Sequence, residues 1–106
     1  MEPSDLSRLA AQLDGVTERR QDGLLCWRYH GRLVARQLDD THVVIRSSFD
    51  ARDAMLRSFP ETFTVSVRFT RHLMVVADLQ HGDRDAIEEA FVSAWRGSVP
   101  LRQGHG

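Results

Sequence analysis

Three segments in the second half of the chain decide the fold that this sequence predicts. They read SFDARDAMLRSFPETFTVSV at residues 48–67, LMVVADL at residues 73–79 and GDRDAIEEAFVSAWR at residues 82–96. Ser48 is a good helix N-cap, and Pro60 disfavours the helical conformation in the residue before it, so we expect a helix over residues 49–58. Residues 63–67 then alternate between apolar and polar side chains, which predicts a half-buried strand.

The apolar run at residues 73–79 predicts a central strand, and a long helix is expected to follow it. Asp83 and Asp85 suit the positive N-terminal end of that helix, and Gly97 is a natural stop. We expect the two aromatic residues of its apolar stripe to anchor the helix to the sheet. The stripe comprises Ile87, Ala90, Phe91, Ala94 and Trp95.

The first half of the chain predicts one helix and three strands. Ser4 can cap a helix whose leucines recur at helical spacing from Leu6 to Leu13, and Gly15 is its natural stop. Residues 17–23 are polar and charged, which predicts a loop. Tight turns are expected at residues 30–31 and 39–40. The expected strands are residues 24–29, 32–38 and 41–46.

These elements follow the order α-β-β-β-α-β-β-α, and short turns between successive strands favour an antiparallel sheet. The predicted fold class is α+β, a two-layer sandwich in which helices cover one face of a five-stranded sheet. We expect one domain over residues 1–106, with a disordered tail at residues 101–106. Both faces of the strand at residues 24–29 mix apolar and polar side chains, so the face that covers the core stays open.

Composition is that of a water-soluble globular domain. The chain has 106 residues, of which 42% are hydrophobic and 27% charged, as is ordinary for such domains. No apolar run approaches the roughly 20 residues that span a bilayer, and residues 1–5 do not resemble a secretory signal. Cys26 is the single cysteine, so it cannot form an intramolecular disulfide, and we expect a reducing, cytoplasmic location.

Four segments carry a resemblance to a known family. They read WRYHGRLVA at residues 27–35, RDAML at 52–56, PETFTV at 60–65 and DRDAIEEAFVSAWR at 83–96. In this order and spacing they resemble the MmcQ/YjbR-like family, whose first hairpin commonly reads aromatic-Arg-x-x-Gly-Lys-x-Phe-Ala. Arg32 stands in the position of that lysine. The resemblance covers residues 6–102 and implies an α-β3-α-β2-α sandwich, a role in DNA binding and no established catalytic residues.

The chain departs from the family pattern between its last two strands. Many members resemble Thr-Pro-His-Tyr-x-Gly-Tyr-Pro-Trp there, whereas residues 66–74 read SVRFTRHLM, without the proline, the glycine or the tryptophan. If this loop is the working surface of the family, the ligand of this chain differs or the affinity is lost.

Charge is distributed unevenly along a nearly neutral chain. The formal net charge is −1, and all 14 basic residues other than histidine are arginine. The arginine preference is explained either by coding bias in a GC-rich genome or by selection for planar, bidentate phosphate contacts. Residues 19–36 contain five arginines and one acid, whereas residues 83–89 contain four acids and one arginine. A basic hairpin and an acidic helix on opposite surfaces would hide a patch behind the neutral total.

The sequence therefore yields a site hypothesis based on phosphate contacts. Six residues are candidates for a phosphate-binding surface: Arg28, Arg32, Arg36, Arg68, Arg71 and His72. Three aromatic residues are candidates for positions near the bases: Trp27, Tyr29 and Phe69. The alternative is a solvated sheet face whose arginines pair with helix carboxylates.

No pattern in the sequence predicts catalysis, a metal or a cofactor. The five histidines lie in no recognisable ligand motif, and Cys26 sits between apolar strand residues as a small core side chain does. Three functions follow: a non-enzymatic protein that binds DNA weakly and salt-dependently, a protein-interaction module, which includes a homodimer, and a small-ligand-binding protein. The first is the leading hypothesis because the family resemblance and the arginine-rich hairpin agree.

Overall fold

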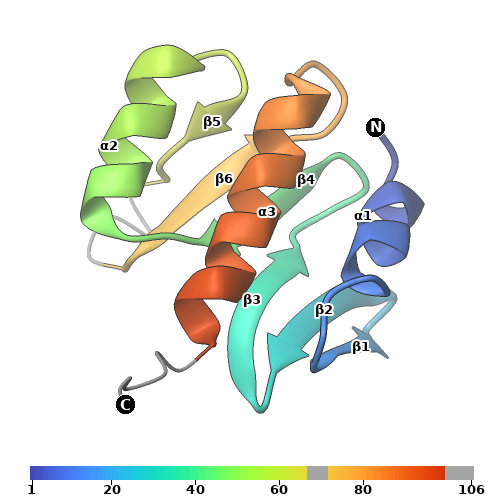
Figure 1. The fold of residues 1–106 in the computed structure, drawn as a ribbon. Coiled ribbons are helices and arrows are strands. Elements are labelled where there is room, and N and C mark those ends of the chain that lie inside the picture. Colours follow the sequence, from blue (N-terminus) through green and yellow to red (C-terminus); the bar gives the residue numbers. More distant parts are fainter. Residues whose placement is uncertain (67–71, 100–106) are drawn as a thin grey trace, which may run out of the picture.

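The structure, a computed structural model, describes residues 1–66 and 72–99. It contains three helices and six strands in the described residues (Figure 1). In chain order they are α1 (Pro3–Ala10), β1 (Val16–Gln21), β2 (Leu24–Tyr29), β3 (Arg32–Gln37), β4 (His42–Arg46), α2 (Phe49–Ser58), β5 (Phe63–Thr64), β6 (Met74–Asp78) and α3 (Arg84–Ser98).

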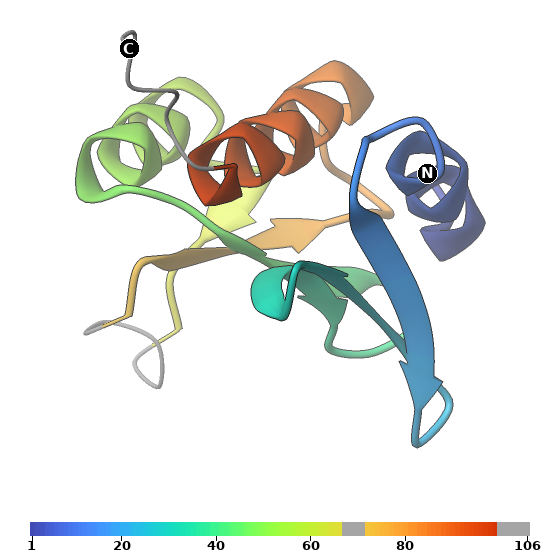
Figure 2. The same ribbon diagram turned by 60° about the horizontal axis from the view of Figure 1, so that its bottom comes forward.

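The strands form one open antiparallel sheet. Their order in the described part of the chain is β1-β2-β3-β4-β6-β5, and each neighbouring pair is antiparallel. Figure 2 shows the three helices together on one side of the sheet. The α+β class, the antiparallel sheet and the placement of the helices on one face are therefore confirmed. The prediction of five strands is wrong, because the sheet already has six within the described residues.

The additional strand is β1, which lies where the sequence predicted a loop. Five of its six residues are exposed, because an edge strand has only one neighbour and need not bury a side chain every second residue. Its hairpin with β2 turns at Asp22 and Gly23, whose φ angles are 54° and 79°. Two positive φ angles match the twist of adjoining strands, and Asp-Gly is a strong signal for such a turn. The polar composition of residues 17–23 favoured a loop over a strand, although Asp22 and Gly23 carry the signal for a hairpin turn.

Most other boundaries agree with the sequence to within two residues. Helix α2 spans the predicted range, and the Oγ of its N-cap Ser48 accepts a hydrogen bond from the N–H of Ala51 at 3.1 Å. Helix α1 differs, because its N-cap is Glu2, with Asp5 completing a capping box, and because it ends at Ala10. Strand β5 is shorter than expected. Val67, the last residue predicted for it, and the predicted tail lie outside the described residues.

The core lies between the helices and one face of the sheet, which settles the question that the mixed strand pattern left open. Leu25 and Trp27 of β2 point to this inner face and are buried. The Trp27 ring meets Phe91 of α3 edge-to-face, with ring centroids 5.4 Å apart. Trp27 also donates a 2.7 Å hydrogen bond from Nε1 to Oε1 of Glu18 in β1. Aromatic packing and one polar contact thus join α3, β2 and β1.

Only one of the two predicted aromatic anchors of α3 is fully buried. Phe91 has no exposed surface. Trp95 is half-buried at the rim of the core, and its Nε1 donates a 2.9 Å hydrogen bond to the carbonyl of Asp14. The two rings therefore hold the helix in different ways, one by packing and one by a contact to the loop after α1.

Replacing Phe91 by alanine tests this account of the core. We expect Phe91→Ala to lower the free energy of unfolding by about 3–5 kcal/mol, because it removes a fully buried ring and leaves a cavity beside Trp27. Chemical denaturation followed by tryptophan fluorescence measures the loss. A loss below about 1 kcal/mol would show that Phe91 is not central to the core.

Candidate functional site

The face of the sheet that carries no helix is the candidate site, and we call it the open face (Figure 2). Side chains alternate between the two faces along each strand. Because Trp27 of β2 and Ile45 of β4 are buried on the inner face, their neighbours Arg28 and Arg46 point to the open face.

Each of the four strands β1 to β4 contributes one arginine to the open face. Arg19 of β1 pairs with Cys26 of β2, and Cys26 pairs with Arg36 of β3. In β4, Val44 pairs with Arg36 and completes this row. Arg28 lies two residues after Cys26, and Arg46 two residues after Val44, so both lie in the adjacent row of side chains. Diagonal neighbours in a sheet are about 7–8 Å apart, so successive arginines alternate between two rows at about this spacing. Arg19, Arg28, Arg36 and Arg46 form what we call the four-arginine surface.

The two rows of the four-arginine surface contain no carboxylate in the described residues. Glu18, the acidic residue of β1, is on the inner face, where it accepts the hydrogen bond from Trp27. Within residues 1–66 and 72–99, no ion pair involves Arg19, Arg28 or Arg46. The positive charges of Arg19, Arg28 and Arg46 are therefore not paired with a carboxylate among the described residues.

Local contacts leave most of the guanidinium donors of Arg19, Arg28 and Arg46 available. Arg28 donates one hydrogen bond, from Nη1 to the carbonyl of Gly31 at 3.2 Å, out of the five N–H donors that a guanidinium carries. Arg19, Arg28 and Arg46 are exposed, whereas Arg36 is half-buried. Three of the four cations can thus reach a ligand from solvent without rearrangement of the backbone.

Apolar side chains lie beside the arginines on the open face. Val44 has no exposed surface and Val76 is 7% exposed, with Leu38 and Met74 packed against them. Cys26 is half-buried. This second, smaller cluster covers the central strands with apolar side chains on the side opposite the main core.

The structure brings together some of the predicted site residues and separates others. Arg28 and Arg36 share the open face. Arg32 does not join them, because it pairs with Tyr29, whose ring packs against the inner core. A β-bulge between Trp27 and Arg28 leaves Val34 and Ala35 both buried.

The other predicted site residues that the structure describes, Trp27, Tyr29 and His72, are not part of the four-arginine surface. The ring of Trp27 is fully buried. Tyr29 is half-buried, with its ring centroid 4.3 Å from that of His30. His72 is exposed just before β6, and its carbonyl accepts a 2.8 Å hydrogen bond from Arg52. Arg68, Phe69 and Arg71 lie outside the described residues.

Sequence reasoning missed two members of the surface, Arg19 and Arg46. Arg19 was in the arginine-rich stretch, but its segment was predicted to be a loop and so had no face. Arg46 was in a predicted strand, two residues from Val44, and the spacing alone placed those two side chains on one face. The sequence alone does not give the register between strands, and the register determines which side chains of neighbouring strands lie in one row.

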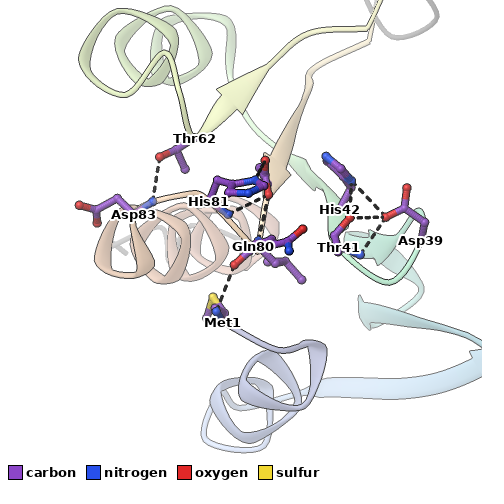
Figure 3. A network of polar contacts seen from close by, with 10 residues as sticks. Met1, Asp39, Thr41, His42, Thr62, Gln80, His81 and Asp83 are labelled. Carbon is purple, nitrogen blue, oxygen red and sulfur yellow. Dashed lines mark hydrogen bonds and ion pairs between the residues drawn. The ribbon is translucent and has the colours of Figure 1, made fainter.

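A second cluster of titratable residues lies at one end of the sheet (Figure 3). His42 contacts Asp39 at 3.1 Å, and His81 contacts Asp78 at 3.2 Å, in each case from Nδ1 to a carboxylate oxygen. The carboxylate of Asp78 also accepts hydrogen bonds from the N–H groups of Gln80 and His81, at 2.9 and 3.0 Å. These contacts close the turn between β6 and α3.

Backbone donors lower the pKa of both carboxylates in this cluster. The N–H of His81 is the main cause of the lowered pKa of Asp78, and the N–H of Thr41 is the main cause for Asp39. Across the described ranges, no group of three or more His, Cys, Asp or Glu side chains could hold a metal ion. Each His–Asp pair thus stabilises the turn in which it lies.

Comparisons with known proteins identify no relative. No family model, no curated protein and no solved structure matches this chain. A helix long and apolar enough to cross a membrane is also absent from the described residues.

The lowered carboxylate pKa values predict the acid sensitivity of the fold. Asp78 titrates below its ordinary value of 3.8 in the folded protein, so the unfolded chain binds more protons between the two pKa values. The stabilisation is nearly complete above about pH 5 and is lost as pH falls through the lower, folded pKa. We expect Asp78→Asn to reduce the fall in melting temperature between about pH 5 and about pH 3.

A matched control is Asp53→Asn, which changes an exposed carboxylate on α2 that has no hydrogen-bond partner among the described residues. This variant should lose as much melting temperature on acidification as the unmodified protein. An equal loss in Asp78→Asn would show that the turn carboxylate does not contribute to acid sensitivity.

Proposed function

We propose that this protein binds the phosphate backbone of DNA, without catalysis, through the four-arginine surface. The supporting observation is the presence of one arginine on each of four adjacent strands, in two rows that hold no carboxylate among the described residues. Guanidinium groups bind phosphate oxygens bidentately, and a line of them suits a polyanion better than an isolated phosphate.

The location of the acids supports the same proposal. Helix α3 carries Asp85, Glu88 and Glu89 on the opposite side of the sheet from the four-arginine surface. The formal net charge of −1 is thus the sum of separated charges. A polyanion approaching the open face meets the arginines first and stays distant from the helix carboxylates.

The composition of the open face favours binding that is independent of sequence. In the described strands, no Phe, Tyr or Trp occupies an open-face position, so these strands offer no ring for base stacking. Phosphate contacts fix position without reading bases. We therefore expect similar affinities for oligonucleotides of different sequence and equal length.

The family resemblance adds to the proposal. We propose that the chain has the YjbR-like fold with β1 added at the edge of the sheet. Without β1, the element order becomes α-β3-α-β2-α, the order that the resemblance implies. The added strand then supplies Arg19, and the single cysteine is consistent with a cytoplasmic location for this activity.

Salt dependence with charge-reversed variants tests the proposal. The three exposed arginines predict a slope of log K against log salt of about −2.1 for single strands and about −2.7 for duplex DNA. Affinity should therefore fall roughly 20- to 40-fold between about 50 mM and about 200 mM salt. Arg28→Glu should weaken binding and reduce the slope by about one contact, as measured by fluorescence anisotropy with labelled oligonucleotides.

The matched control for this experiment is Arg32→Glu, which makes the same charge change in the same hairpin on the other face. Its affinity should stay close to that of the unmodified protein. Equal losses in both variants would indicate a general charge effect and contradict a surface on the open face. A DNA affinity that does not change with salt concentration would favour the protein-interaction module. A stable dimer in light scattering whose mass does not change when DNA is added would favour it as well.

The single cysteine provides an independent test of which face binds. Cys26 lies between Arg19 and Arg36 in the strand register, so DNA on this face should cover its thiol. We expect saturating oligonucleotide to slow the reaction of Cys26 with a maleimide at low salt, and about 200 mM salt should restore the rate. Mass spectrometry over time measures the modified fraction.

A second thiol reagent of different charge separates shielding of the Cys26 thiol from a change in its reactivity. If DNA lowers the rate for a neutral maleimide and for a cationic thiol reagent alike, the thiol is covered. An unchanged rate in the presence of bound DNA would place the binding surface elsewhere on the molecule.

A further inference from the structure

An apolar groove runs between α2 and α3, which lie side by side on the inner face of the sheet (Figures 1 and 2). Small side chains line both of its walls, and aromatic residues at the end of α2 and in β5 complete it. The residues that matter here are Ala51 and Ala54 of α2, Ala90 and Ser93 of α3, Phe59 and Phe63.

The groove exists because the two helices pack on different strands. Helix α2 contacts β5, whereas α3 contacts β3 and β4. Alanine and serine are too short to close the space between two helices that are each fixed to the sheet. Phe59, at the end of the groove, is 38% exposed and is one of the few large apolar side chains in the described residues that face solvent.

The dimensions of the groove suit part of a helix better than a whole small molecule. Its volume is about 240 Å³, below the roughly 300–1,000 Å³ of pockets that enclose drug-sized ligands. On each helix, the first and last lining residues are seven positions apart: Ala51 and Ser58 on α2, and Ala86 and Ser93 on α3. This separation corresponds to about 10 Å at a rise of about 1.5 Å per residue. Two turns of an amphipathic helix present two or three anchor side chains over this length.

One charged side chain, Glu89, lines the groove. It lies next to Ala90 on α3 and is exposed. Within residues 1–66 and 72–99, no ion pair or hydrogen bond involves its carboxylate. A carboxylate without a partner beside an apolar surface complements a ligand that combines apolar anchors with a basic group.

We infer that the groove between α2 and α3 binds an amphipathic helix of a partner protein, through apolar anchors at i, i+4 and i+7 and a Lys or Arg that reaches Glu89. The anchors fill the space that the short side chains leave and cover Phe59. The basic residue pairs with Glu89 at the rim and sets the position of the helix. This surface lies on the opposite side of the sheet from the four-arginine surface, so both are accessible together.

Two labelled peptides of 16 residues test the inference. Both carry leucine at positions i, i+4 and i+7 on an alanine-rich helix, and they differ only in having lysine or glutamate beside the leucines. The lysine peptide should bind about tenfold or more tightly than the glutamate peptide in fluorescence anisotropy. Glu89→Lys should reverse this preference, which a general affinity of basic peptides for the protein cannot do.

Ala54→Leu tests whether the peptide sits in the groove, because it fills the space from an exposed helix position without touching the core. It should weaken the lysine peptide about tenfold or more. The matched control is Ala11→Leu, at another exposed alanine outside the groove, which should leave binding unchanged; circular dichroism verifies that both variants fold.

Three results would overturn the inference. They are equal binding of the two peptides, equal effects of Ala54→Leu and Ala11→Leu, and a dimer in sedimentation that Ala54→Leu dissociates. The last result would assign the groove to a second copy of this chain.

Discussion

The buried side chain of Trp27 is the contact on which the rest of the structure depends. Its ring packs edge-to-face on Phe91 of α3, and this fixes which face of β2 is the inner one. Its indole N–H binds Glu18, and this holds the polar edge strand β1 in register. Since side chains alternate along a strand, burying Trp27 also turns Arg28 outward, and drawing Glu18 inward turns Arg19 outward. The core and the charge pattern of the open face therefore have one origin.

The same contact explains how a nearly neutral protein keeps a basic surface. If Glu18 were on the open face, it would lie one strand away from Arg28 and would offset part of the positive charge. The hydrogen bond to Trp27 gives this carboxylate a partner on the inner face instead. The helix carboxylates are separated from the arginines by the thickness of the sheet and the core. Sheet topology, more than composition, decides what a ligand meets on each side.

The sequence predicted the fold well where local chemistry specifies it. Ser48 and Pro60 mark the ends of α2 because capping and proline sterics act within a few residues. His30 and Gly31 form the predicted tight turn. Strand β1 was missed because hydrophobic periodicity does not apply to an exposed edge strand, although Asp22 and Gly23 carry a clear hairpin signal.

Predicting the site required more than local chemistry. Arg28 and Arg32 are close in sequence and both exposed, yet the hairpin register places them on opposite faces. Trp27 was expected near bases, but its size and apolar ring are what a core requires, and its partner Phe91 is 64 positions away in the printed sequence. Such pairings depend on the packing of distant elements, which one sequence without its structure does not specify.

The two hairpin turns have a consequence for how the chain folds. Strands β1, β2 and β3 are joined by two-residue loops, each with both φ angles positive, so their contacts are short in sequence. Hairpins of this kind form in about 1–10 μs. Pairing of β4 with β6, in contrast, must first close a long loop that contains α2 and β5, which slows its formation. Three of the four arginine-bearing strands can therefore assemble early, as a local nucleus on which the more distant half of the sheet condenses.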